Sequence, residues 1–133
     1  MIGIADADHE ESAEDGSNLL ISKLSCSLVG VTGTIKISRD SLAHRAYGRT
    51  ECIEEFRCNY GLNERFRELM FSRDLKATGT DEEGEIRMAE LSGHPFFVGT
   101  LFVPQLSSRP GVPHPLIVAF LRSAKSFAEL ADI

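Results

Sequence analysis

The chain alternates short apolar stretches with turn-forming residues, a pattern that predicts several β-strands and few helices. The predicted strands lie at residues 19–30, 32–37, 51–58, 75–80, 86–91 and 96–102. The first is equally compatible with two shorter strands around Ser22–Lys23, and the third is extended with Ile53 and Phe56 as its apolar positions. Asp81–Gly84 turns the fourth into the fifth as a β-hairpin. The sixth is continuously apolar, which is typical of a strand buried on both faces.

Three helices are expected, and each has a recognisable start. The first ends at Tyr47, the second spans about residues 64–73, and the third spans about residues 116–130. Asp40 or Ser41 caps the first, which Gly48 ends, and Asn63 caps the second. Pro115 opens the third, which is amphipathic. Its apolar positions are Ile117, Phe120, Leu121, Ala124 and Phe127.

The composition of the 133 residues is that of an ordinary globular protein and predicts one domain over residues 1–133. The net charge of −6 arises within the first fifteen residues, which carry six acidic side chains and no basic one. Because the chain has no basic patch, we expect no nucleic-acid partner. No apolar run approaches the roughly 20 residues of a membrane span, so we expect no membrane partner. The acidic N-terminus resembles no targeting signal, which favours a cytoplasmic location.

Residues 5–18 form a polar, acidic segment that predicts a loop. Asp6 and Asp8 match the first two ligand positions of a calcium-binding loop. The sixth and twelfth positions hold Glu11 and Ser17, where such a loop requires Gly and Glu. A solvated loop is therefore the favoured interpretation, and divalent-cation binding is the alternative. We predict no metal site and no cofactor.

No nucleophile motif or phosphate-binding loop is present in the sequence. The cysteines Cys26, Cys52 and Cys58 are odd in number and lack C-x-x-C spacing, so we expect reduced, buried thiols. The four histidines share no metal-ligand spacing, and a surface or structural role is expected for each. They are His9, His44, His94 and His114.

The most specific segment is residues 93–116, GHPFFVGTLFVPQLSSRPGVPHPL, in which an apolar strand leads into a V-P-Q turn and then to H-P-L at a helix start. It resembles the end of the class I glutamine amidotransferase domain of CTP synthase, where F-H-P-E precedes a Ser/Thr-rich loop and H-P-L. Residues 32–37 are similar to that family's G-G-T-M-R-L segment, and residues 54–63 to its segment ending in R-Y-E-V-N. Residues 75–91 and 3–12 also match in order, so the resemblance covers essentially the whole chain.

The resemblance implies an α/β fold, namely the C-terminal half of a flavodoxin-like glutamine amidotransferase domain. Such a fold has a mostly parallel sheet with flanking helices and a small antiparallel hairpin. Strands of the family's other half would sit beside those present here, so an apolar sheet edge would be left unpaired. Three explanations stay open: a truncated product, half of a split domain completed by a second chain, or self-association through the open edge.

The resemblance also implies an activity and its loss. In the family, a cysteine attacks the side-chain amide of glutamine, a histidine serves as base and acid, and a glutamate orients the histidine. The ammonia released is used to aminate UTP. The resemblance assigns the histidine to Val103, the glutamate to Gln105 and the nucleophile to a position upstream of residue 1. We therefore expect no intact catalytic residue and no glutaminase activity from the chain alone.

Arg57 matches the middle arginine of the family's basic segment, which the resemblance assigns to the α-carboxylate of glutamine. An ordinary ion pair with Glu54 or Glu55 is the alternative. Two functions follow as hypotheses. The first is a degenerate, non-catalytic module that binds a partner or a glutamine-like ligand. The second is one half of a CTP-synthase-type enzyme whose other half supplies the missing groups, and a vestigial product is the third possibility.

Overall fold

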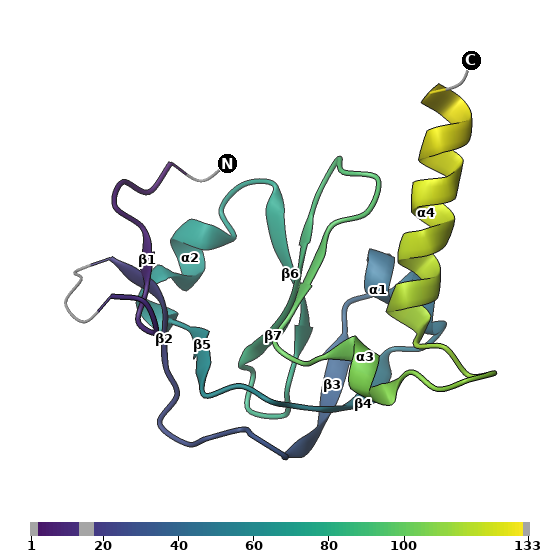
Figure 1. Cartoon of the computed structure of the whole chain (residues 1–133). Helices are drawn as coiled ribbons and strands as arrows, with labels where there is room; N and C mark the ends of the chain where they lie inside the picture. The colour runs from purple at the N-terminus through teal and green to yellow at the C-terminus, as the bar shows by residue number, and fades with distance from the viewer. Residues whose placement is uncertain (1–2, 14–17, 132–133) are drawn as a thin grey trace.

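The fold consists of two β-sheets, several short helices and one long helix at the C-terminal end (Figure 1). The computed structural model describes residues 3–13 and 18–131. The strands are β1 (Asp8–His9), β2 (Leu19–Lys23), β3 (Thr32–Ile37), β4 (Glu51–Glu55), β5 (Tyr60–Leu62), β6 (Leu75–Thr80), β7 (Ile86–Leu91) and β8 (Val98–Thr100). The helices are α1 (Leu42–Tyr47), the 3-10 helix η1 (Glu64–Phe66), α2 (Arg67–Met70), α3 (Pro104–Ser107) and α4 (Pro115–Ala131). One sheet has the order β1-β2-β5 and the other the order β4-β3-β6-β7-β8.

The five-stranded sheet is antiparallel throughout, so the prediction of a mostly parallel sheet is wrong. Parallel neighbours need a crossover of about a dozen residues or more, usually a helix that runs back along the strand. The connections from β6 to β7 and from β7 to β8 are only five and six residues long. The helix α1 joins β3 to β4, but its six residues rise only about 9 Å, whereas β3 spans about 20 Å. The chain therefore returns alongside β3 in the opposite direction.

The predicted β6–β7 hairpin is confirmed at its predicted bounds. Asp81 holds the turn, because its Oδ1 accepts the backbone N–H groups of Glu83 and Glu85 at 3.0 and 2.9 Å. Its Oδ2 accepts the Nε and Nη2 hydrogens of Arg87 at 3.0 and 2.7 Å. The Arg87 guanidinium also lies 5.5 Å over the ring of Phe56. The largely buried ion pair thus closes the hairpin on itself, and the cation–π contact ties the hairpin to the segment after β4.

The strand predicted at residues 96–102 is shorter and more exposed than expected. We predicted burial on both faces, but β8 is the last strand of its sheet, and Phe97 just before it is 41% exposed. Among the described residues, no strand pairs with the outer edge of β8. The apolar run therefore has a paired strand on one side only, whereas a strand in the interior of a sheet has one on each side.

Other expected elements form only in part. Residues 19–30 contribute β2 alone, and residues 51–58 contribute β4 alone. The helix expected over residues 64–73 is replaced by η1 and α2 and ends at Met70. Within the acidic segment 5–18, β1 forms a two-residue strand that pairs in parallel with β2. Residues 14–17 of that segment lie outside the described residues.

The hydrophobic core lies between the five-stranded sheet, α1 and the first turn of α4. Its buried residues are Ile35, Ile37, Ala43, Cys52, Phe56, Met88, Phe102 and Leu116. Gly79 of β6 leaves room for this packing, since a Cβ there would come within 2.4 Å of the Met88 Cε. The helix α4 buries only Leu116, and its later turns extend past the sheet (Figure 1). Within the described part of the chain, no helix has both the length and the apolar character needed to cross a membrane.

Candidate functional site

The turn after β8 holds the two positions that the resemblance assigns to catalysis. Val103 is extended, with φ −109° and ψ 96°, and directly precedes Pro104, the first residue of α3. Its carbonyl accepts the N–H of Leu106 at 3.0 Å and so closes the turn. Gln105 is exposed on α3. At these two positions the turn offers an isopropyl group and a neutral amide.

The segment that carries Arg57 lies against this turn. Phe56 packs edge-on against Phe102, with ring centroids 6.4 Å apart and an interplanar angle of 78°. This contact brings the residues after β4 next to the residues before Val103. The Nη2 of Arg57 lies 2.6 Å from Oε1 of Glu55, and the arginine side chain is 51% exposed. Glu55 is thus the ion-pair partner, and ligand binding by Arg57 stays a prediction.

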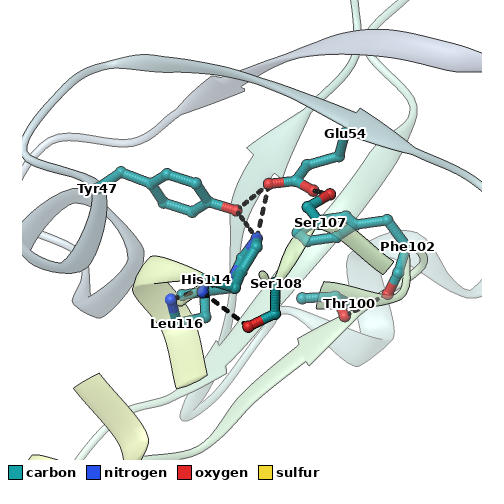
Figure 2. A network of polar contacts seen from close by, with 8 residues as sticks. All are labelled: Tyr47, Glu54, Thr100, Phe102, Ser107, Ser108, His114 and Leu116. Atoms are coloured by element: carbon teal, nitrogen blue, oxygen red, sulfur yellow. Dashed lines mark hydrogen bonds and ion pairs between the residues drawn. The ribbon is translucent and has the colours of Figure 1, made fainter. Parts of the chain in front are cut away.

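Next to the turn, Glu54 and His114 form a buried pair (Figure 2). His114 Nε2 lies 2.8 Å from Glu54 Oε1, and both residues are 3% exposed. The Tyr47 hydroxyl donates to the same Oε1 at 2.5 Å, and Ser107 Oγ donates to Oε2 at 3.3 Å. The four residues come from α1, β4, α3 and the residue just before α4. The Glu54–His114 pair and its two hydrogen-bond partners therefore join α1, β4 and α3, the helix that carries Gln105, to the start of α4.

Hydrogen bonds to His114 assign its proton to Nε2. Nδ1 accepts the backbone N–H of Leu116 at 3.2 Å, so in the neutral ring Nδ1 carries no hydrogen. Nε2 then bears the hydrogen and donates it to Glu54. The His114 backbone N–H donates to Ser108 Oγ at 3.1 Å, and its carbonyl accepts the N–H of Val118 at 3.1 Å. His114 therefore caps α4, and both of its ring nitrogens are committed to the protein.

The electrostatics of the pair favour an ionised Glu54 beside a protonated Tyr47. Burial and the hydrogen bond to Glu54 raise the pKa of Tyr47 far above its usual value. Burial alone would raise the pKa of Glu54, but hydrogen bonds from His114 and Tyr47 outweigh that effect and lower it. The carboxylate is therefore charged, fully hydrogen-bonded and closed to solvent. This arrangement fixes neighbouring elements, and it exposes no group to a dissolved substrate.

Acidification is expected to weaken the fold through Glu54. Because the folded pKa of Glu54 lies below its ordinary value of 4.5, its contribution is complete above pH 4.5 and is lost as the pH falls further. Urea unfolding at pH 7 and pH 3 measures the loss, with Glu54→Gln as the matched variant. The parent chain should lose more stability than the variant over this interval. Equal losses for both proteins would contradict the assignment.

Glu54 was not predicted as a core residue and was named only as a possible partner of Arg57. Of the surface or structural role expected for His114, the structure shows the structural one. In β4 and the residue after it, Cys52, Glu54 and Phe56 alternate on the buried side, whereas Ile53 is 67% exposed. The available sequence signal was the pair Cys52 and Phe56, which lie two positions before and two positions after Glu54.

The cysteines do not share one environment, so the prediction that all three are buried is wrong. Cys26 is exposed, Cys58 is half-buried and Cys52 is buried, and all three are free thiols. Burial raises the pKa of the Cys52 thiol to about 11, which leaves it a poor nucleophile at neutral pH. Among the described residues, no three His, Cys, Asp or Glu side chains are grouped as metal ligands would be.

Comparison with known proteins identifies CTP synthases as relatives. The enzymes of Flavobacterium psychrophilum and Cytophaga hutchinsonii are each 31% identical to this chain, over 93% and 97% of its length. The enzyme of Chlorobium phaeobacteroides is 39% identical over 69% of it. The matched regions are 25%, 26% and 16% of those proteins, so the chain spans about a quarter or less of the relatives it matches. No family model matches the chain.

Solved structures give the corresponding fold. The glutaminase domain of Trypanosoma brucei CTP synthase, solved with bound acivicin, superimposes with a TM-score of 0.86 at 19% identity. The match covers 94% of this chain and 53% of that one. A proposed GMP synthase subunit from Thermoplasma acidophilum superimposes with a TM-score of 0.61 at 12% identity, covering 85% and 52%. By sequence homology and by fold, this chain is a relative of CTP synthase and corresponds to part of that family's class I glutamine amidotransferase domain.

Proposed function

We propose that this chain is a non-catalytic glutaminase-like module that acts by binding. The observation that carries the proposal is the turn after β8, which holds Val103 and Gln105 where the resemblance assigns the histidine and glutamate. An isopropyl group neither accepts nor donates a proton. A neutral amide provides no charge to stabilise an imidazolium ion. The binding target is a partner polypeptide or a glutamine-like ligand.

His114 does not replace the missing base. A general base has to come within hydrogen-bond reach of the proton that it removes. His114 is 3% exposed, its Nδ1 accepts a backbone hydrogen, and its Nε2 faces Glu54. A substrate in solution therefore has no route to either nitrogen unless the α3–α4 connection opens.

A glutamine-like ligand would bind through Arg57. Its guanidinium suits a carboxylate, and its present partner Glu55 is 36% exposed. Exposed ion pairs are worth about 0–1 kcal/mol, so a ligand carboxylate displaces Glu55 at little cost. Phe56, the residue before Arg57, packs against Phe102 and so keeps Arg57 close to the altered turn.

The purified chain is expected to release no ammonia from glutamine above the spontaneous background. The test is a coupled ammonia assay on the parent chain, with Arg57→Ala as the informative variant and Arg39→Ala as a control at another exposed arginine. Ammonia release that is abolished by Arg57→Ala and retained by Arg39→Ala would overturn the proposal.

A second candidate function is one half of a CTP-synthase-type enzyme. It is favoured by the extent of the two structural matches, because about half of each matched structure has no counterpart in this chain. In that case a second polypeptide supplies the nucleophile and a base, and the complex makes ammonia for the amination of UTP. The same assay run on the purified complex distinguishes the two candidates, since the non-catalytic module stays inactive after assembly.

A further inference from the structure

A hollow of about 480 Å³ lies beside the start of α1, at the opposite end of β3 from Arg57. Its walls are the loop from β3 to α1, the start of β6, the end of β7 and the loop after β7. Two of its lining residues are buried, Thr78 at 6% exposure and Glu90 at 7%. Arg45 and Lys76 also line it and are exposed. The hollow thus has an anion at its floor and cations at its mouth, and its volume is that of a small-molecule site.

Lys76 and Glu90 carry opposite charges directly across from each other and do not pair. They are register partners in β6 and β7, so their side chains leave the same face of the sheet. Glu90 is held by α1 instead, because its two carboxylate oxygens accept the N–H groups of Leu42 and Ala43 at 2.7 and 2.9 Å. Among the described residues, no carboxylate lies within ion-pair distance of the Lys76 ammonium. Each Glu90 oxygen keeps a second lone pair, and Lys76 keeps its N–H donors.

Arg45 adds a second cation to the mouth of the hollow, from α1 rather than from the sheet. Its Nη1 donates to the backbone carbonyl of Asp40 at 2.7 Å, which fixes one end of the guanidinium. Its other N–H groups have no acceptor within residues 3–13 and 18–131. A guanidinium and an ammonium group at one opening favour a carboxylate as the group that binds there.

Thr78 has a buried hydroxyl that the protein leaves without a partner. It is the extra residue of a β-bulge, since its two neighbours in β6 pair with consecutive residues of β7 and it pairs with none. In the described structure, its Oγ1 makes no hydrogen bond. Buried polar groups are nearly always satisfied, and bulges often redirect a side chain beside a binding site. Rotation about χ1 exchanges the hydroxyl with the methyl group, so a ligand in the hollow can reach this hydroxyl.

We infer that this hollow binds a small zwitterion, a molecule with an ammonium and a carboxylate group on a short carbon chain. The ammonium group donates to the Glu90 carboxylate and to the Thr78 hydroxyl. The carboxylate accepts hydrogen bonds from Lys76 and Arg45. A simple anion would meet the Glu90 charge, and a simple cation would meet Lys76 and Arg45, so one molecule with both groups fits best. The inference goes beyond the proposed binding role, which uses Arg57 at the other end of β3.

The test is titration of the isotope-labelled chain with glycine, β-alanine and γ-aminobutyrate, followed through its backbone amide NMR shifts. These probes share both charged groups and differ in the spacing between them, whereas acetate and methylammonium carry one group each. We expect at least one zwitterion to give saturable shifts at residues 42–43, 76–78 and 90–93. Its affinity should be at least tenfold higher than that of acetate or methylammonium.

Lys76→Ala and Thr78→Val probe the two ends of the ligand. Each should weaken binding about tenfold, because each removes a hydrogen bond to a charged group. Lys76 is exposed and valine has nearly the shape of threonine, so both variants should fold, which the amide spectrum checks. Thr78→Val should also leave the free energy of unfolding no lower, because it removes an unsatisfied hydroxyl. Lys36→Ala is the matched control, since Lys36 is an exposed lysine of β3 outside the hollow, and it should bind as the parent does.

Three results would overturn the inference: no saturable shift with any of the three zwitterions, equal affinity for acetate or methylammonium, or binding unaffected by both Lys76→Ala and Thr78→Val. Binding that is lost in Arg57→Ala and retained in Lys76→Ala would also overturn it, because the zwitterion would then sit at Arg57. Ammonia release plays no part in this readout, so failure here and failure of the non-catalytic proposal are distinguishable.

Discussion

The His114→Ala variant is expected to unfold with a free energy about 3–5 kcal/mol below that of the parent chain. The substitution leaves the Glu54 carboxylate buried at 3% exposure with one of its charge-assisted partners removed. It also removes the acceptor of the Leu116 N–H at the start of α4. Total stabilities of single domains are about 5–15 kcal/mol, so this loss is a large share. Urea denaturation followed by far-UV circular dichroism measures it.

Two comparisons separate this effect from simple side-chain loss. Ser107→Ala removes the longer 3.3 Å bond to Glu54 from an exposed residue and should cost about 1 kcal/mol or less. In a double-mutant cycle, Glu54→Ala and His114→Ala should together cost at least about 1 kcal/mol less than the sum of the single changes. Additive losses, or a His114→Ala loss no larger than that of Ser107→Ala, would show that the pair is not coupled.

The Glu54–His114 pair anchors the turn after β8. Ser107 ends α3, His114 precedes α4, and Glu54 receives hydrogen bonds from both. This anchoring does not use the side chains at Val103 and Gln105. The shape of the turn therefore does not depend on which side chains stand at those two positions.

The Arg87→Ala variant is expected to lose about 3 kcal/mol of stability. Arg87 is buried and donates two hydrogen bonds to Asp81 at 3.0 and 2.7 Å, while its guanidinium lies over Phe56. Removing one partner of a buried ion pair leaves the other charge buried without a partner. Asp81 retains 17% of its side-chain exposure, so we expect the lower end of the usual range. Thermal and urea unfolding both measure the change.

Lys125→Ala is the matched control for this prediction. Lys125 and Glu129 lie 3.7 Å apart on α4 with side chains 77% and 65% exposed, and the loss should be no more than about 0.5 kcal/mol. Arg87→Lys should fall between the two, because an ammonium ion keeps the charge but not the forked geometry. Similar stabilities for Arg87→Ala and Lys125→Ala would contradict a stabilising role for the Asp81–Arg87 pair.

Local sequence signals predicted the elements that depend on few distant contacts. The β6–β7 hairpin follows from alternation on both sides of a turn that contains Asp81 and Gly84, and it forms at the predicted bounds. The cap at Ser41 and the end at Gly48 frame α1 as expected, and Pro115 opens α4. Each signal acts within a few residues, so it is readable along the chain.

The strand β4 is an example in which local reading failed. Ile53 is hydrophobic and Glu54 is acidic, yet Ile53 is exposed and Glu54 is buried. A carboxylate is stable in the interior only with partners, and those partners lie seven residues before it at Tyr47 and sixty residues after it at His114. Hydrophobicity along the strand carries no information about groups so distant in sequence.

The sequence by itself determined the hairpin, the amphipathic α4 and the resemblance to CTP synthase. These follow from residue identities and short spacings. The tertiary structure alone decided that the main sheet is antiparallel, that Glu54 and His114 meet in the core and that β8 lies at an open edge. Strand order and long-range pairing depend on which apolar surfaces pack against each other and so leave water. That choice is set by the packing of the whole chain.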